Sequence, residues 1–309
     1  MDRNFDMFMK LTDHILFIII SFLSFKEAAR TCVLSKRWRH VWRATKRIEF
    51  DERFFVSVGE SDESQETQRR VFIHFVRQWM ENYREPNIES FQLTCLKPGD
   101  FRGEMELCIA FAIKRNVKVL GLDFSDPTWR EDDLDHDHAA LFDLPLNVYG
   151  HAVLESLKLF SCSFRLPEFM NFGALKDLSL GWLELRMSVI EAILVNCRLL
   201  ESLSLNKCWN IEQLDIKGPN LRLRSLVIDK CKFLEGWYAI EAPNLRFLKY
   251  SGAVGFFEVE INRDCMEEAD LDFGLEFEFN EALGDVLCGL LEQLYPIRIL
   301  TVCSYMLQV

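Results

Sequence analysis

The chain has 309 residues, of which 49% are hydrophobic and 27% are charged, and its formal net charge is −12. This composition supports a globular core without covalent staples and leaves room for two structural units. Residues 1–47 hold ten Lys/Arg against four Asp/Glu, so this segment carries +6 and the remainder carries −18. General nucleic-acid binding is disfavoured, because phosphate contacts need positive potential across the binding surface. An acidic partner is expected for the N-terminal segment.

The apolar run from Ile15 to Leu23 is too short to be a membrane helix. Charged or polar residues flank it on both sides, whereas a bilayer requires about 20 apolar residues. No cleavage site of the signal-peptide type follows it at the right distance. The sequence therefore predicts neither membrane insertion nor secretion.

Residues 8–50 are predicted to form a module of three helices. Thr12 and Asp13 can cap the first helix, whose apolar residues extend nearly all the way round it. A short helix from Lys26 to Cys32 and a third from Ser35 to about Lys46 complete the module. A unit of about 40 residues seldom folds alone. Its surplus apolar surface must be covered either by a partner protein or by the rest of the chain.

Three strings in this module resemble the F-box of plant F-box/leucine-rich-repeat proteins. They are Leu11-Thr12-Asp13-His14-Ile15-Leu16, Ser21-Phe22-Leu23, and the run from Lys26 to Trp42, in which Val33-Leu34-Ser35-Lys36-Arg37-Trp38-Arg39 is the most specific block. The resemblance implies binding to a Skp-type adaptor, and through it to a cullin, in a Skp/cullin/F-box ubiquitin ligase. The implied adaptor contacts are Leu11, Ile15, Ile19, Leu23, Leu34, Trp38 and Trp42.

Two positions depart from the F-box pattern. The family usually has proline where this chain has Thr12 and Ser24. Proline at a helix start fixes φ at little cost, so its absence loosens the entry into the helix. Thr12 can provide a cap instead. The basic stretch from Lys36 to Arg43 could also be interpreted as a nuclear localisation signal or an RNA-binding patch, but helical spacing separates its tryptophans from most of its arginines.

Residues 51–70 are predicted to be an acidic linker, because the segment from Ser57 to Thr67 is polar and lacks periodicity. Residues 71–116 are expected to form bridging or capping helices. A clear 3.6-residue period begins there and ends near Pro86, carried by Val71, Phe72, Phe75, Val76 and Trp79. A repeat domain requires such a cap, since its first repeat otherwise exposes an apolar flank.

Residues 117–309 are predicted to be a leucine-rich-repeat domain. The phrase L-x-x-L-x-L recurs from Leu154, Leu175 and Leu200, and again from Leu223 and Leu245 with Ile228 and Tyr250 at its last position, so successive copies start 21, 25, 23 and 22 residues apart. Weaker copies start at Val117, Met266 and Ile297. This interval is typical of leucine-rich repeats, in which a short strand and a returning segment form one coil of a horseshoe. The fold class is therefore an α/β repeat: a three-helix F-box followed by a leucine-rich-repeat solenoid.

The strand residues between the leucines are expected to face a concave surface that binds a target protein, since extended concave surfaces favour protein partners over small substrates. A solvated face without a ligand is the alternative. The candidate target-binding residues are Lys158, Ser179, Ser204, Val227, Phe247 and Lys249. Cys162, Cys208 and Cys231 recur just past the strands and are interpreted as buried structural thiols.

The ten cysteines are scattered, which favours a reducing compartment, cytoplasm or nucleus, over a disulfide framework or a zinc site. The run from Asp132 to His138 is the most metal-like segment, but consecutive loop residues seldom make a preformed site, and a solvated insertion is predicted. We find no phosphate-binding glycine motif, no G-x-S-x-G and no H-E-x-x-H. No metal, cofactor or catalytic residue is expected.

The segments from Ala112 to Leu120 and from Phe142 to Pro145 resemble the FBD type of plant F-box/leucine-rich-repeat protein. Those relatives usually continue further, so a short or C-terminally truncated member is expected, with an uncapped last coil. The resemblance implies the substrate-receptor subunit of a ligase, not an enzyme, with a target that the sequence does not identify. The alternatives are a repeat-based interaction module with a vestigial F-box, outside a ligase, and a nucleic-acid-binding scaffold that uses the basic N-terminal segment.

Overall fold

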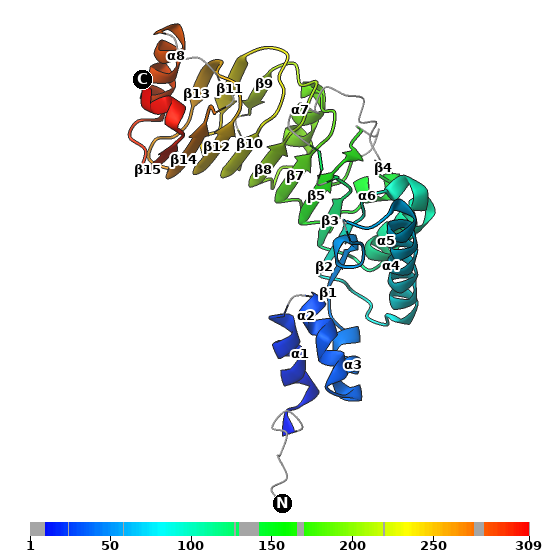
Figure 1. The fold of residues 1–309 in the computed structure, drawn as a ribbon. Helices are drawn as coiled ribbons and strands as arrows, with labels where there is room; N and C mark the ends of the chain where they lie inside the picture. The colour runs from blue at the N-terminus through cyan, green and yellow to red at the C-terminus, as the bar shows by residue number, and fades with distance from the viewer. Residues whose placement is uncertain are drawn as a thin grey trace, which may run out of the picture. The chain divides into compact units, whose positions relative to one another are not determined.

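The computed structural model describes residues 10–23, 25–57, 59–126, 128–129, 142–165, 170–218, 220–274 and 281–308 (Figure 1). The chain forms two compact units. Unit 1 comprises Met1–Thr94 and Gly103–Leu120, and unit 2 comprises Cys95–Arg102 and Gly121–Val309. Unit 1 therefore holds the predicted three-helix module together with the helices that follow it. Ser24 and the run from Asp132 to His138 lie outside the described residues.

Unit 1 begins with the three helices that the sequence predicts. Its elements are α1 (Asp13–Ser21), α2 (Phe25–Arg30), η2 (Thr31–Val33), α3 (Lys36–Arg43), β1 (Arg47–Asp51), η3 (Glu52–Phe54), α4 (Asp62–Asn82), β2 (Ser90–Thr94) and most of α5 (Arg102–Lys114). Thr12 caps α1 by accepting from the Ile15 N–H at 3.5 Å, and Ser35 caps α3 by accepting from the Trp38 N–H at 3.4 Å. These caps satisfy backbone donors that a helix start leaves free.

Helix α4 corrects the predicted extent of the acidic linker. The helix begins at Asp62, so residues 62–70 are helical and only the segment before them is a connection. Ser61 caps it by accepting from the Ser64 N–H at 3.4 Å. Asp62 and Glu63 occupy its first turn, where negative charge is favourable next to the positive end of the helix dipole. The acidic composition that suggested a loop is thus the signature of a helix start.

A cluster of aromatic side chains packs the N-terminal helices against α4 and β1. The Phe25 ring of α2 lies 5.7 Å from Trp42 of α3, 5.5 Å from Phe50 of β1 and 5.6 Å from Trp79 of α4, measured between centroids. Phe50 and Trp79 are 5.3 Å apart in an edge-to-face arrangement, a geometry that the ring quadrupoles favour. The surplus apolar surface of the module is therefore covered in part by the same chain.

The ion pair between Arg69 and Glu52 is buried in unit 1. The Arg69 Nε of α4 is 2.7 Å from the Glu52 Oε1 of η3, and the two side chains are 2% and 0% exposed. Arg69 also contacts Glu66 at 3.2 Å. A buried charge is tolerated only when it is paired and hydrogen-bonded. Glu52 and Arg69 thus fix the turn after β1 against α4.

Unit 2 is a solenoid of short parallel strands. Its elements are η4 (Pro98–Phe101), β4 (Phe142–Asp143), α6 (Leu146–Tyr149), β5 (Ser156–Phe160), β6 (Cys162–Ser163), β7 (Asp177–Gly181), α7 (Met187–Asn196), β8 (Ser202–Asn206), β9 (Leu214–Lys217), β10 (Ser225–Asp229), β11 (Trp237–Glu241), β12 (Phe247–Ser251), β13 (Phe256–Glu260), β14 (Glu268–Asp272), α8 (Glu281–Leu294), β15 (Ile299–Val302) and η6 (Ser304–Gln308). Strand β3 (Val119–Asp123) lies where the two units meet in sequence. Each predicted repeat motif, including the weaker copies, coincides with one strand of the β3, β5, β7, β8, β10, β12, β14 and β15 series.

The strands β5, β7, β8, β10, β12, β14 and β15 pair in parallel and without a shift of register (Figure 1). The first leucine of each motif strand therefore stacks on its equivalent in the next coil, as Leu178, Leu203 and Leu226 do. All three are at most 1% exposed. Alternate residues of a strand point to opposite faces, so one set fills the core while the other faces out. The predicted solenoid is confirmed.

Each coil turns a corner directly after its strand. Ser161, Trp182, Lys207 and Lys230 follow four successive motif strands, and all have a positive φ between 51° and 55°. Their N–H groups donate to the last strand residue of the next coil, as the Lys207 N–H does to the Asp229 O at 2.7 Å. This left-handed conformation is uncommon for residues other than glycine and asparagine. The repeating hydrogen bond stabilises it in these four coils.

The cysteines after the corners are buried, as predicted. Cys162 and Cys208 are 0% exposed and Cys231 is 8% exposed. Burial raises the pKa of the Cys162 and Cys208 thiols. All ten cysteines lie among the described residues and are free thiols. These three act as small apolar side chains at the turn.

The returning side of unit 2 changes character along the solenoid. Helix α7 follows β7, whereas β9, β11 and β13 form a second parallel sheet in the order β13-β11-β9. Strand β9 is thus an edge strand of that sheet. Helix α8 packs against β13, where the Gln293 Oε1 accepts from the Val259 N–H at 2.6 Å.

Candidate interaction surfaces

The N-terminal module keeps a row of apolar side chains in solvent. On α1, Ile15, Ile18 and Phe22 are 40%, 44% and 83% exposed, while Leu16 and Ile20 of the same helix are buried. Before α3, Val33 and Leu34 are 87% and 62% exposed. Large apolar groups gathered on one small module mark a binding surface. We call Ile15, Ile18, Phe22, Val33 and Leu34 the apolar face.

A contact between α1 and α3 brings the two parts of this face together. The Arg37 Nε donates to the Asp13 Oδ1 at 2.6 Å, and its Nη2 donates to the Leu11 carbonyl. Because Val33 and Leu34 come immediately before α3, they lie at the same end of the module as Leu11 and Ile15. The contact therefore places Val33 and Leu34 near the start of α1, whereas Phe22 follows its other end.

The structure sorts the seven predicted adaptor contacts into two groups. Ile15 and Leu34 are exposed, and Leu11, Ile19 and Leu23 are partly exposed. Trp38 and Trp42 are only 6% and 8% exposed. Both are largely covered by the chain itself, since Trp42 packs inside unit 1 against Phe25 and against Trp79 at 6.3 Å. Their contact with an adaptor stays a prediction.

Three residues of the apolar face are not among the predicted adaptor contacts. Helical periodicity puts Ile18 and Phe22 in the i, i+3, i+7 row that starts at Ile15, but the adaptor contacts were taken from the F-box resemblance, which did not include them. Val33 adjoins Leu34 in η2. Basic side chains surround the face, since Lys26, Arg30, Lys36, Arg39 and Arg43 are all exposed. An acidic partner would meet complementary charge there.

Thr12 stands where the F-box pattern has proline, and its backbone is already compatible with that residue. Its φ is −70°, close to the angle of about −65° that the proline ring imposes. We expect Thr12→Pro to change the free energy of unfolding by less than about 1 kcal/mol, because the lost cap and the reduced entropy of the unfolded chain are similar in size and opposite in sign. Urea denaturation of the two proteins measures this. A loss of several kcal/mol would contradict it.

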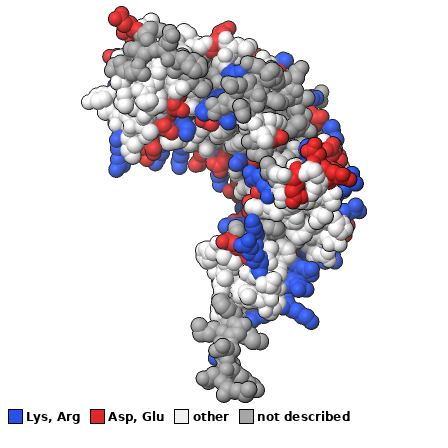
Figure 2. All heavy atoms as spheres, in the orientation of Figure 1, with Lys and Arg blue, Asp and Glu red and all other residues white. Residues whose placement is uncertain are grey.

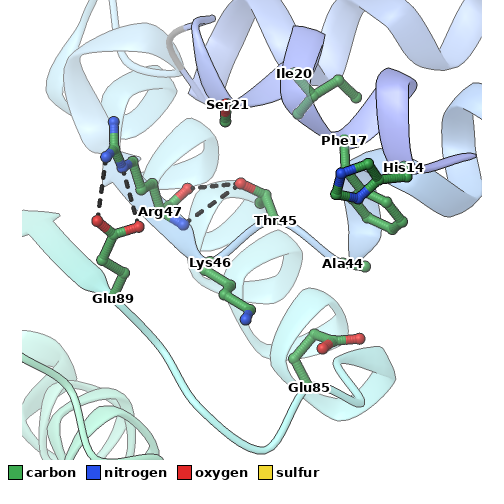
Figure 3. A pocket seen from close by; sticks show the side chains of 10 residues that line it. All are labelled: His14, Phe17, Ile20, Ser21, Ala44, Thr45, Lys46, Arg47, Glu85 and Glu89. Atoms are coloured by element: carbon green, nitrogen blue, oxygen red, sulfur yellow. Dashed lines mark hydrogen bonds and ion pairs between the residues drawn. The ribbon is translucent and has the colours of Figure 1, made fainter.

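A groove of about 430 Å³ runs beside α1 on the side of His14 and Phe17 (Figure 3). Lys46 and Arg47 line it from the segment after α3, and Glu85 and Glu89 line it from the segment before β2. Arg47 and Glu89 form two hydrogen bonds, at 3.1 and 3.3 Å, and these raise the pKa of Arg47. This pair ties the start of β1 to the start of β2.

The same groove contains residue types that hydrolases use, but the Ser21 hydroxyl donates its proton elsewhere. The Ser21 hydroxyl donates to the Ile18 carbonyl at 2.7 Å, within α1. Among the described residues no hydrogen bond joins His14 to Ser21 or Glu85 (Figure 3). Nucleophilic catalysis needs a base within hydrogen-bonding reach of the nucleophile. The geometry of this groove therefore supports packing between elements of unit 1.

The outward residues of the unit 2 strands form continuous rows. Lys158, Ser179, Ser204, Val227 and Lys249 occupy equivalent positions on five neighbouring strands. Phe247 lies two residues earlier on β12, in the adjacent row of the same face. All six are partly or fully exposed. The structure thus brings the predicted target-binding residues together on one face.

Charges on this face are largely paired between neighbouring coils. Lys176 contacts Glu155 at 3.1 Å, Arg246 contacts Glu267 at 3.3 Å, and Lys249 contacts Asp270 at 3.3 Å. Figure 2 shows basic and acidic side chains interleaved along this side of the repeats. Burial, together with the nearby Glu201 carboxylate, raises the pKa of Asp177. The face is a mixed-charge protein surface and not a single-sign patch.

Within the described residues, no group of three or more His, Cys, Asp or Glu side chains is arranged to hold a metal ion. No helix in the described ranges is both long enough and apolar enough to cross a bilayer. Together, the helical module with its apolar face and the solenoid of stacked coils define a leucine-rich-repeat protein with an N-terminal helical module.

Comparison with known proteins specifies that class. The sequence model of the F-box domain matches residues 8–49, and that of the LRR repeats of FBD-associated F-box protein At5g56370 matches residues 112–265. F-box/LRR-repeat protein 25 of Arabidopsis thaliana is 31% identical over 80% of this chain and 86% of its own length. The chain belongs to the F-box/leucine-rich-repeat family.

Two longer Arabidopsis thaliana relatives match almost the whole chain. F-box protein At3g29830 is 37% identical and F-box/LRR-repeat protein At1g56400 is 37% identical, each over 98% of this chain. The chain spans 66% and 64% of their lengths. Among solved structures, that of Listeria monocytogenes InlP aligns with 63% of the chain and 64% of InlP at 12% identity and a TM-score of 0.35, a similarity too weak to define the fold.

Proposed function

We propose that this protein is the substrate-receptor subunit of a Skp/cullin/F-box ubiquitin ligase. The apolar face of the module binds the Skp-type adaptor, and through it the cullin, while the outward rows of the repeats bind a target protein. The observation that carries the proposal is the exposure of Ile15, Phe22, Val33 and Leu34 on a module whose own core is already filled by Phe25, Trp42 and Trp79. These side chains keep between 40% and 87% of their surface in solvent, which leaves apolar area for a partner to cover.

The proposed role requires no catalytic group in this chain. Holding a target near the ligase converts a bimolecular encounter into an effectively intramolecular one, which accelerates transfer through proximity. Lys158, Ser179, Ser204, Val227, Phe247 and Lys249 are the proposed target contacts. Free, mostly buried thiols suit a reducing compartment, cytoplasm or nucleus.

The adaptor interface is tested by co-purification of the chain with a recombinant Skp-type adaptor. We expect Leu34→Asp, and separately Ile15→Asp, to weaken binding at least about 30-fold, because a charge would replace an apolar anchor worth about 2 kcal/mol. Both residues are exposed, so the fold should persist, and circular dichroism checks it. The buried Trp38 and Trp42 are avoided, since their replacement would destabilise unit 1 itself.

Val71→Asp is the matched control. Val71 is an apolar residue of α4 in the same unit, 58% exposed and outside the apolar face, so this variant should bind the adaptor as the unaltered chain does. If the unaltered chain fails to bind any Skp-type adaptor, the F-box is vestigial and the protein is a repeat-based interaction module. Equal binding by all variants would place the interface elsewhere. RNA binding with a steep salt dependence would favour the nucleic-acid alternative.

A further inference from the structure

The small sheet on the returning side of unit 2 keeps an open outward face. Helix α7 packs against β9 and helix α8 packs against β13, so both edges of the sheet β13-β11-β9 are covered. Tyr238 and Ile240 of β11 are buried, as are Phe257 and Val259 of β13. Because strand residues alternate between two faces, the residues between these four point away from the core. This outward face is separate from the strand rows that are proposed to bind the target.

Two aromatic side chains stack on this outward face at the start of their strands. Trp237 of β11 and Phe256 of β13 are paired in register, and their ring centroids are 4.7 Å apart with the ring planes inclined by 28°. Each ring covers part of the other, yet Trp237 is still 42% exposed and Phe256 is 53% exposed. We call these two residues the aromatic pair. Adjacent large aromatic side chains that remain in solvent mark a contact site for a partner.

Carboxylates continue the same face beyond the aromatic pair. Glu258 and Glu260 follow the ring of β13 at two-residue intervals, and Glu241 lies beside Glu260 on β11. None of these three carboxylates has an ion-pair partner among the described residues. Lys217 of β9 is next to Glu241 in register, but its amine contacts Asp215, at 3.5 Å. The face therefore has a surplus of negative charge, which is complementary to a basic partner.

An arginine side chain matches both parts of this face. Its planar guanidinium stacks on aromatic rings through a cation–π interaction and also donates hydrogen bonds to carboxylates. A strand rises about 3.3 Å per residue, so Glu258 and Glu260 lie about 7 and 13 Å beyond the aromatic pair. An extended segment with arginine at every second position has the same spacing. We propose that this face binds an extended, arginine-rich segment of a partner protein, with one guanidinium on the aromatic pair and the following ones at Glu258 and Glu260.

The test measures binding of the full chain to the fluorescein-labelled peptide Ser-Arg-Thr-Arg-Thr-Arg-Ser by fluorescence anisotropy. We expect saturable binding that weakens as salt increases. The double variant Trp237→Ala/Phe256→Ala should lower the affinity at least about tenfold, because it removes the rings on which the first guanidinium stacks. Leu146→Ala is the matched control, since it also removes a large exposed side chain of unit 2 but lies on α6, outside this face. Circular dichroism checks that both variants fold.

A charge reversal tests the acidic part of the face without removing a packed side chain. Glu258→Lys should lower the affinity at least about tenfold, because it replaces a charge-assisted contact with repulsion. Glu191→Lys changes the net charge equally at an exposed position of α7, beyond the opposite edge of the sheet, and should leave the affinity unchanged. If the aromatic double variant does not fold, the comparison of these two variants decides the test.

Two further peptides separate this site from general attraction to an acidic protein. Ser-Thr-Arg-Arg-Arg-Thr-Ser carries the same charge on consecutive arginines and should bind at least about fivefold more weakly, since its spacing does not match the face. The citrulline analogue of the first peptide keeps its shape without its charge and should not bind. The proposal is overturned if the first peptide shows no saturable binding, if Glu258→Lys binds as well as Glu191→Lys, if the folded aromatic variant binds as well as Leu146→Ala, or if the two arginine peptides bind equally.

Discussion

Replacing Arg69 with Met should destabilise unit 1 by about 3–5 kcal/mol, because it leaves the Glu52 carboxylate buried without its countercharge. Glu52 is 0% exposed, and its Oε1 lies 2.7 Å from the Arg69 Nε. Urea denaturation followed by tryptophan fluorescence measures the loss, since Trp38, Trp42 and Trp79 all lie in this unit. Removing one partner of a buried pair costs far more than the pair contributes in net stability.

Arg70→Met is the control for this experiment. Arg70 is the next residue of α4 and also contacts Glu66, at 3.0 Å, but its side chain is 72% exposed. An exposed pair of this kind contributes about 0–1 kcal/mol. The double variant Glu52→Leu/Arg69→Met should recover much of the stability lost in the single variant, since no buried charge then remains. Equal effects of Arg69→Met and Arg70→Met would contradict the buried-pair interpretation.

Leu203→Ala should destabilise unit 2 by about 2–5 kcal/mol, because it removes a fully buried side chain and leaves a cavity. Leu203 lies on β8 and is 0% exposed, stacked between Leu178 and Leu226 of the neighbouring coils. Hydrogen exchange should accelerate first in β7, β8 and β10, since each coil of a solenoid is stabilised mainly by its neighbours.

Ser204→Ala, one residue further along the same strand, is the matched substitution. Ser204 points outward, and its Oγ accepts only a surface hydrogen bond from Asn206 at 2.9 Å among the described contacts. Its replacement should change stability by less than about 0.5 kcal/mol. Similar exchange rates in the two variants would mean that the coil stacking contributes less to unit 2 than its burial indicates.

The repeats were predictable because their signal is both local and periodic. A strand residue that faces the core must be apolar in every coil, so the stacking of Leu178, Leu203 and Leu226 appears in the sequence as a recurring interval. The helices of the module were also predictable from local signals, since Thr12 and Ser35 are residue types that cap helices and they stand at the starts of α1 and α3.

The errors have a different origin. The burial of Trp42 was not predicted because the residues that bury it, such as Trp79, lie far along the chain, and periodicity carries no information on which distant element covers a face. The start of α4 at Asp62 was missed because acidic residues before an apolar period are compatible with both a linker and a first turn. The left-handed conformation of the corner residues could not be predicted from their residue types, since Trp182 and Lys207 adopt a positive φ that glycine prefers.

The aromatic cluster of unit 1 has a practical consequence for the boundaries of the F-box. Phe25 and Trp42 belong to the F-box segment, residues 8–49, whereas Phe50 and Trp79, two of the rings packed against Phe25, lie directly after that segment and in α4. A fragment cut after residue 50 would therefore present two large aromatic surfaces to water and tend to aggregate. Adaptor-binding work on this protein should retain α4, because the segment that sequence comparison recognises is smaller than the piece that folds.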